Sequence, residues 1–90
     1  MIVAEARPSL RRGVLLRYDR VRERHVLMYP EGVLVLNETA AEVLRQCDGT
    51  ATVAEIGAAL SGRYQGFRDG DVAEVLRRLA RRGMIEVSTD

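Results

Sequence analysis

The fold of this chain is decided by residues 25–40, which read HVLMY-PEG-VLVL-NETA. Two runs rich in apolar residues, 25–29 and 33–36, read as strands on either side of a Pro-Glu-Gly segment. Proline presets the backbone angle of the first turn position, and Gly32 can close a three-residue loop in the left-handed conformation. The stretch therefore predicts an antiparallel hairpin with a three-residue loop. At Asn37, a favoured N-cap residue, the pattern changes to a helical period.

The N-terminal side of this stretch predicts one further strand. Residues 14–18 read VLLRY, and the charged segment 19–23 connects them to residues 25–29. Residues 1–12 are interpreted as a lead-in to the domain, for which mobility is one option.

The C-terminal side predicts three short helices. Asp48 and Gly49 are expected to end the first, and Thr52 with Glu55 has the spacing of a capping box for the second. A loop over residues 65–70 separates the second helix from the third, which Asp71 and Glu74 are expected to start. Apolar residues at helical spacing define the inner faces: Ala40, Val43, Leu44 and Cys47 in the first, Val53, Ile56, Leu60 and Tyr64 in the second, and Val72, Val75, Leu76 and Leu79 in the third.

The sequence also indicates where the third helix ends. Gly83 fits the position just after a helix C-terminus, and residues 84–87 are expected to form either a short final strand or an extended tail. Together the elements predict a single domain over residues 1–90 with an α+β fold. Its arrangement is winged helix-turn-helix-like, a three-stranded antiparallel sheet followed by a three-helix bundle.

The composition is that of a small soluble domain. The chain has 90 residues, of which 47% are hydrophobic and 30% charged, with a formal net charge of +1. Every basic residue is arginine, a bias that a GC-rich genome explains as readily as function does. No apolar run is long enough for a membrane helix and no signal peptide is visible, so we expect a cytoplasmic protein without a membrane partner.

The residue types needed for catalysis are scarce. There is one cysteine and one histidine, and they fall on different predicted elements. Cys47 is interpreted as a buried inert thiol and His25 as a satisfied or exposed strand residue. Neither their spacing nor that of the acids matches a metal site, and no phosphate-binding glycine loop is present. We therefore expect a protein that is not an enzyme and holds no cofactor or metal.

Two features suggest binding. The run Val33–Leu34–Val35–Leu36 lacks the polar alternation of a one-faced sheet. Either this strand is buried on both faces, or it is an edge strand that accepts another strand. On the third helix, arginines four residues apart form two adjacent rows, Arg77 with Arg81 and Arg78 with Arg82. These rows fit a solvated surface, a face for an acidic partner, or a DNA recognition helix.

The order of the motifs resembles the PqqD family. The matching blocks are Arg12-Gly13-Val14, Leu27-Met28-Tyr29-Pro30-Glu31-Gly32, Leu36-Asn37-Glu38-Thr39-Ala40 and Cys47-Asp48-Gly49. The resemblance runs from about residue 8 to residue 85, nearly the whole chain. Each block is weak alone, whereas the ordered set is specific; residues 64–70 are the least characteristic.

The resemblance implies a function and a site. Members of this family look like recognition domains that bind the short precursor peptide of pyrroloquinoline quinone. They present it to a radical S-adenosylmethionine enzyme, which links a glutamate to a tyrosine within the peptide. In related domains the peptide adds as a strand beside the third strand and against the third helix. Carried onto this sequence, the implied groove is formed by Val33, Leu34, Val35, Leu36, Val75, Leu76, Arg78, Leu79 and Arg82.

Two other functions fit the same features. A winged-helix DNA-binding domain would carry a stronger basic balance than the net charge of +1, so we expect no nucleic-acid partner. A homodimer could instead pair two copies through the apolar strand at residues 33–36.

Overall fold

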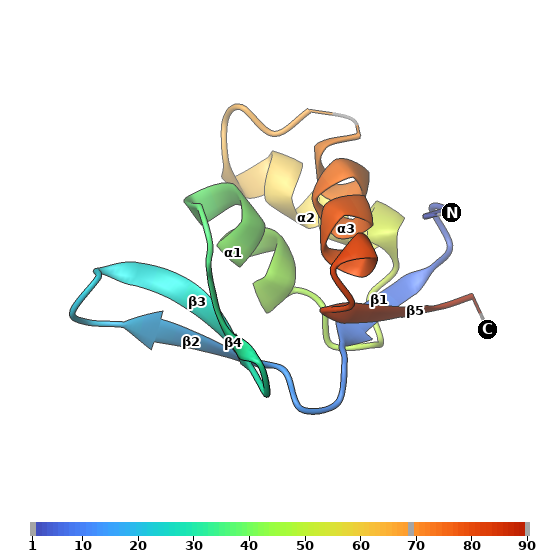
Figure 1. The fold of residues 1–90 in the computed structure, drawn as a ribbon. Helices are drawn as coiled ribbons and strands as arrows, with labels where there is room; N and C mark the ends of the chain where they lie inside the picture. Colours follow the sequence, from blue (N-terminus) through green and yellow to red (C-terminus); the bar gives the residue numbers. More distant parts are fainter. Residues whose placement is uncertain (1, 69, 90) are drawn as a thin grey trace.

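The computed structural model describes residues 2–68 and 70–89. Met1, Asp69 and Asp90 lie outside the described residues, so one position of the loop predicted over residues 65–70 is not assessed. The elements are β1 (Arg7–Leu10), β2 (Leu15–Asp19), β3 (Arg24–Tyr29), β4 (Gly32–Val35), α1 (Glu38–Arg45), α2 (Val53–Arg63), α3 (Asp71–Arg81) and β5 (Ile85–Ser88). The three helices lie on one side of the strands (Figure 1). The predicted α+β fold, a three-stranded antiparallel sheet followed by three helices, is confirmed.

The main sheet has the strand order β2-β3-β4, and both pairs are antiparallel. Tyr29 pairs with Gly32, so the hairpin loop holds only Pro30 and Glu31, and the predicted three-residue loop is wrong. Neither loop residue has a positive φ, and Gly32 has a φ of +158°, close to extended backbone. Proline fixes a negative φ at the first loop position, which excludes the mirror-image turns. The loop nevertheless has two residues, and Gly32 joins β4.

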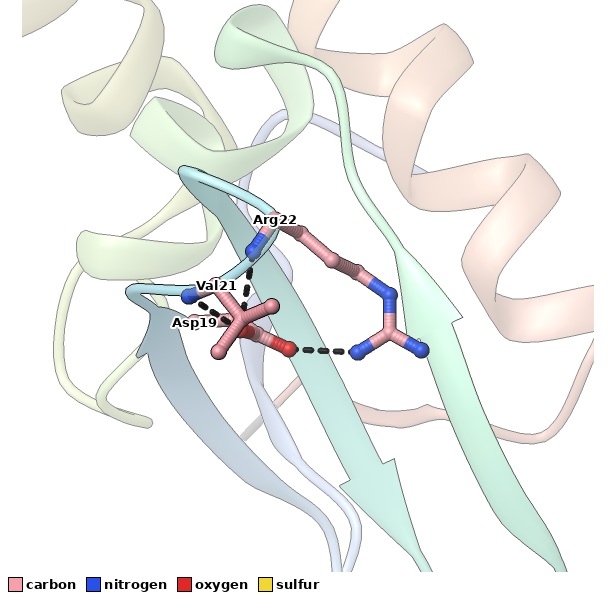
Figure 2. Close-up of polar contacts among 3 residues, drawn as sticks. All are labelled: Asp19, Val21 and Arg22. Atoms are coloured by element: carbon pink, nitrogen blue, oxygen red, sulfur yellow. Dashed lines mark hydrogen bonds and ion pairs between the residues drawn. The ribbon is translucent and has the colours of Figure 1, made fainter.

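The β2–β3 connection is stabilised by one aspartate. Asp19 Oδ1 accepts hydrogen bonds from the backbone N–H groups of Val21 and Arg22, and Oδ2 pairs with the Arg22 guanidinium (Figure 2). The N–H of Arg22, followed by its guanidinium, lowers the pKa of Asp19 below its ordinary value. The turn is thus fixed although residues 20–23 are exposed.

The helix termini follow the sequence signals in most places. The Asn37 side chain accepts the N–H of Ala40, and Thr52 and Glu55 form the reciprocal capping box. At the end of α3, Gly83 has a φ of +74°, and the N–H groups of Gly83 and Met84 bond to the carbonyls of Ala80 and Leu79. This is the Schellman arrangement that the glycine predicted.

Two helix boundaries differ in detail from the predictions. Helix α1 ends at Arg45, three residues before the predicted stop at Asp48. Helix α3 starts at Asp71 as predicted, but its N-cap is Gly70 without a side-chain hydrogen bond. The Asp71 carboxylate instead accepts the N–H of Arg68 and so closes the preceding loop.

The N-terminal segment is more than a lead-in. Residues Arg7–Leu10 form β1, which pairs antiparallel with β5 in a second, two-stranded sheet. Of the two options for residues 84–87, the strand is therefore confirmed. The other edge of β1 bonds to the segment between α1 and α2, since Pro8 O accepts the N–H of Gly49 and Ala6 O accepts that of Val53. Residues 7–10, for which the sequence predicted no pairing strand, are thus held in place by segments that are distant in the chain.

One apolar cluster joins the sheets and the helices. Leu27, Leu60 and Leu76 are fully buried within it. Cys47 is buried as expected, and burial raises the pKa of its thiol to about 12. Of the apolar positions predicted for the helices, Tyr64 is the exception, because it is exposed just after α2. Within residues 2–68 and 70–89, no helix is long and apolar enough to cross a membrane.

Candidate binding groove between β4 and α3

Strand β4 is one of the two edge strands of the main sheet, as one of the two sequence interpretations required. Its backbone groups alternate in direction. Leu36 N–H bonds to His25 O, and in an antiparallel ladder the hydrogen-bonded pairs alternate with non-bonded ones. In the observed register, Leu34 therefore bonds to β3, whereas the N–H and C=O groups of Val33 and Val35 point outward. Strand β4 thus offers two residues whose donors and acceptors face away from the sheet.

The side chains of β4 also alternate. Leu34 and Leu36 turn toward the helices, where Leu34 is half-buried and Leu36 is buried. Val33 and Val35 are 45% and 43% exposed on the opposite face. The interpretation of residues 33–36 as a strand buried on both faces is therefore wrong. The apolar residues on the outer face remain open to solvent.

A groove of about 190 Å³ runs between the edge of β4 and α3. It is lined by Leu34, Val35, Leu36, Asn37, Ala40, Val75, Arg78, Leu79 and Arg82. Seven of these nine lining residues belong to the predicted site, so residues far apart in the sequence meet here. Val75 and Leu79 are almost fully buried at its base, whereas Arg78 and Arg82 are exposed.

Two predicted residues do not line the groove. Leu76 is fully buried in the core. It is next to Val75 in the sequence, but it does not lie on the side of α3 that faces β4. Val33 contributes an outward backbone at the edge, but its side chain lies on the other face of the sheet. Each can support the groove only through packing or through the backbone.

Sequence reasoning missed Asn37 and Ala40, which come from the start of α1. Asn37 follows β4 almost directly, so the first turn of α1 stands over the end of the strand. A small residue at position 40 leaves space there, and the Asn37–Ala40 hydrogen bond of 2.8 Å holds the turn in place. The short connection between residues 35 and 38 was the available signal.

The two arginine rows of α3 differ in position. Arg78 and Arg82 border the groove, while Arg77 and Arg81 do not line it. In the part of the chain that the structure describes, neither Arg78 nor Arg82 forms an ion pair; the pairs present are Asp19–Arg22 and Glu42–Arg45. The groove therefore has an apolar base and a positively charged rim with unpaired guanidinium groups.

A larger hollow of about 770 Å³ lies elsewhere, between the β2–β3 hairpin, α1 and the residues after α2. His25 Nε2 accepts a hydrogen bond from the Arg45 guanidinium there at 2.9 Å, and its ring meets Tyr18 edge-on. Glu42 pairs with the same arginine. These groups satisfy one another, and no set of His, Cys, Asp or Glu side chains among the described residues could hold a metal. His25 is thus a satisfied strand residue, as expected.

Comparison with known proteins identifies similar sequences. The family model for coenzyme PQQ synthesis protein D, PqqD, matches residues 24–85. A PqqA binding protein of Azotobacter vinelandii is 41% identical over 89% of this chain and 89% of its own length. One from Stutzerimonas stutzeri is 46% identical over 73% of this chain and 75% of its own.

Solved structures match the fold as well. The solution structure of the PqqD truncation of Methylobacterium extorquens PqqCD, described as a stand-alone recognition element for ribosomally synthesised and modified peptides, has a TM-score of 0.72. It is 38% identical, and the match covers 88% of this chain and 87% of that one. The heterocyclase TruD contains the same fold at a TM-score of 0.70, with 16% identity, in 12% of its length.

Proposed function

Because the chain belongs to the PqqD family, we propose that it binds the precursor peptide of pyrroloquinoline quinone and presents it to the enzyme that modifies the peptide. The observation that carries the proposal is the open edge of β4 beside an apolar groove. The peptide adds as a strand next to β4 and bonds to Val33 and Val35 through its backbone. Alternate peptide side chains enter the groove toward Val75 and Leu79.

The groove chemistry indicates what the peptide carries. Apolar side chains facing the base supply most of the affinity, since burial of apolar area is the largest favourable contribution. Carboxylates facing the rim pair with Arg78 or Arg82, because a guanidinium matches a carboxylate with two parallel hydrogen bonds. An acidic peptide with spaced apolar residues therefore fits best.

The chain acts as an adaptor and not as a catalyst in this proposal. The chemistry, formation of a bond between a glutamate and a tyrosine of the peptide, belongs to a radical S-adenosylmethionine enzyme. This chain supplies recognition and positioning without a cofactor of its own. We place its action in the cytoplasm, where the precursor peptide is made.

Titration of isotope-labelled protein with unlabelled precursor peptide tests the site. Amide shifts are expected in residues 33–36 and 72–82, with smaller changes in β2 on the far side of the sheet. Saturable binding with changes confined to residues 14–29 would contradict the groove while leaving peptide binding itself intact. No saturable binding at all would contradict the function.

Binding to duplex DNA provides the second test, because a winged-helix DNA-binding domain was the competing interpretation. The net charge of +1 predicts weak binding at about 150 mM salt. A gel shift at low micromolar protein measures it. Tight, salt-dependent retention would favour the DNA-binding function over the peptide-binding one.

A further inference from the structure

The face of the main sheet opposite the helices carries a second apolar surface. Leu15 pairs with Met28, and Met28 pairs with Val33, so the three side chains form one row across the strands. They are 52%, 43% and 45% exposed. Val35, in the next row, is 43% exposed beside the buried Val26. Contiguous exposed apolar residues on a small domain mark an interaction surface, and the helices lie on the other side (Figure 1).

Arginines border this surface. Strand alternation places Arg17 and Asp19 on the same face as Leu15 and Met28. Arg24 is not available there, because its guanidinium donates hydrogen bonds to Leu36 O and lines the larger hollow. The Asp19 carboxylate holds the Arg22 guanidinium beside it (Figure 2). The charged groups of the face are therefore Arg17, Arg22 and Asp19, an excess of one positive charge beside the apolar row.

This charge distribution argues against a second copy of the chain as the occupant. In a symmetric dimer the same patch meets itself, so Arg17 would approach the arginines of the other copy. Like charges brought together in this way oppose association. A partner with an apolar centre and carboxylates at its margin has the complementary chemistry.

The proposed peptide strand extends the same face. Residues that pair with Val33 and Val35 through the outward backbone groups project their side chains to the side on which those valines lie. The peptide thus adds a further column to the row Leu15–Met28–Val33. A protein docked on this face touches the chain and the bound peptide at once.

From these observations we propose that the outer face of the β2-β3-β4 sheet, centred on Leu15 and Met28, docks the peptide-modifying enzyme through an apolar patch with an acidic margin. This inference rests on the proposed function. It adds that docking is tighter when the groove is filled, because part of the contact surface is then peptide.

Two variants separate this face from the groove. Leu15→Thr combined with Met28→Thr removes two of the three apolar side chains of the row and introduces β-branched residues, which suit a strand. Arg17→Glu reverses a charge at its border. We expect each to weaken binding of the purified radical enzyme to the peptide-loaded chain at least about tenfold. Peptide affinity, measured separately with labelled peptide, should stay within about twofold of the original.

Val21→Thr is the matched control. Val21 is 94% exposed at the β2–β3 turn, so the control introduces threonine at an exposed apolar residue away from the row. Enzyme affinity should not change. Far-ultraviolet circular dichroism and thermal melting of all variants check that the sheet is intact.

The outcomes are distinguishable. Undiminished enzyme binding by the folded double variant, with peptide binding normal, would overturn the docking face and leave the proposed function standing. Equal enzyme affinity of the original chain with and without peptide would overturn the composite surface. Binding of the original chain to anionic lipid vesicles, lost in the double variant while enzyme binding persists, would assign the face to a membrane instead. Failure of the original chain to bind peptide would contradict the proposed function itself.

Discussion

Strands β1 and β4 are both four residues long, and the chain treats their edges in opposite ways. The edge of β1 that faces away from β5 is occupied by the chain's own backbone, through Gly49 and Val53. The edge of β4 that faces away from β3 stays open beside a groove. The molecule therefore has one strand edge that its own backbone covers and another that stays open among the described residues.

One residue, Pro8, distinguishes the covered edge of β1 from the open edge of β4. Arg11 N–H bonds to Met84 O, so alternation along the ladder turns the backbone of Pro8 away from β5 and toward the covered edge. Pro8 has no N–H to offer there and acts only as an acceptor, which blunts that edge. Strand β4 has valines at the corresponding outward positions and keeps both donors. Whether a strand edge can pair with another strand therefore depends on the residues whose backbone groups point out of that edge.

Removing the covered edge should have the largest effect. Deletion of residues 2–10 removes β1 and the buried Ala6 and Pro8, and it exposes the apolar side of β5. We expect the free energy of unfolding to fall by roughly 3 kcal/mol or more, a large share of the stability of a small domain. Urea denaturation measures the loss. Deletion of residues 2–4 only, which retains β1, should cost clearly less, and equal losses would contradict the importance of the strand.

Removing a backbone donor from the open edge of β4 should weaken peptide binding and not lower the free energy of unfolding. Val35→Pro removes an outward N–H without breaking a bond to β3, because Val35 belongs to a non-bonded pair. The peptide carbonyl loses its partner, which costs about 1–3 kcal/mol, or roughly 5- to 150-fold in Kd. Titration of labelled peptide measures the change.

Val35→Thr is the matched control for the proline, since it alters the side chain and keeps the donor. Its peptide affinity should stay close to that of the original chain. If the folded proline variant bound peptide as well as the threonine variant, the peptide could not be pairing with this edge.

The rim arginines should contribute less than the backbone. Arg78→Ala or Arg82→Ala removes one exposed guanidinium beside the groove, which should cost ~0.2–1 kcal/mol of binding free energy. The loss should shrink as salt rises, because exposed ion pairs are screened. Arg77→Ala and Arg81→Ala remove the neighbouring row and are expected to leave peptide affinity unchanged. Equal losses from both rows would indicate general attraction and not a rim.

The smallest effect is expected at the two residues with reactive side chains. The Cys47 thiol has a pKa of about 12 and so remains protonated at neutral pH, and His25 only shares a hydrogen bond with Arg45. Cys47→Ser and His25→Gln should leave support of peptide cross-linking essentially intact in a reconstituted assay. Loss of that support by a well-folded variant would mean that one of them has a functional role.

The sequence allowed the hairpin, the three helices and most of their caps to be predicted, because each depends on residues close together in the chain. Asn37, Thr52 with Glu55, and Gly83 act over a few residues. Strand β1 could not be predicted in the same way. Its four residues include a proline, and they are ordered by β5 and by the segment near Gly49, both distant in sequence.

Most residues of the candidate groove were predicted, but its details depend on contacts between segments that are distant in the sequence. Periodicity placed Leu76 and Leu79 on one inner face, but only packing decides that Leu76 enters the core while Leu79 reaches the groove. The apolar run at residues 33–36 indicated an edge or a buried strand. The register with β3 decides which, and it also decides that Val33 turns away from the groove.

The open edge of β4 also makes the stability and the aggregation of the folded chain depend on the proposed ligand. An unpaired strand edge with apolar neighbours is a template on which chains aggregate, and a bound strand removes that template. A ligand that binds only the native state adds to its stability by mass action, about 2.7 kcal/mol when its free concentration is one hundred times Kd. Where the peptide is abundant, the chain is both occupied and protected. If the proposed peptide is scarce, we expect the vacant chain to melt at a lower temperature than the peptide-bound chain.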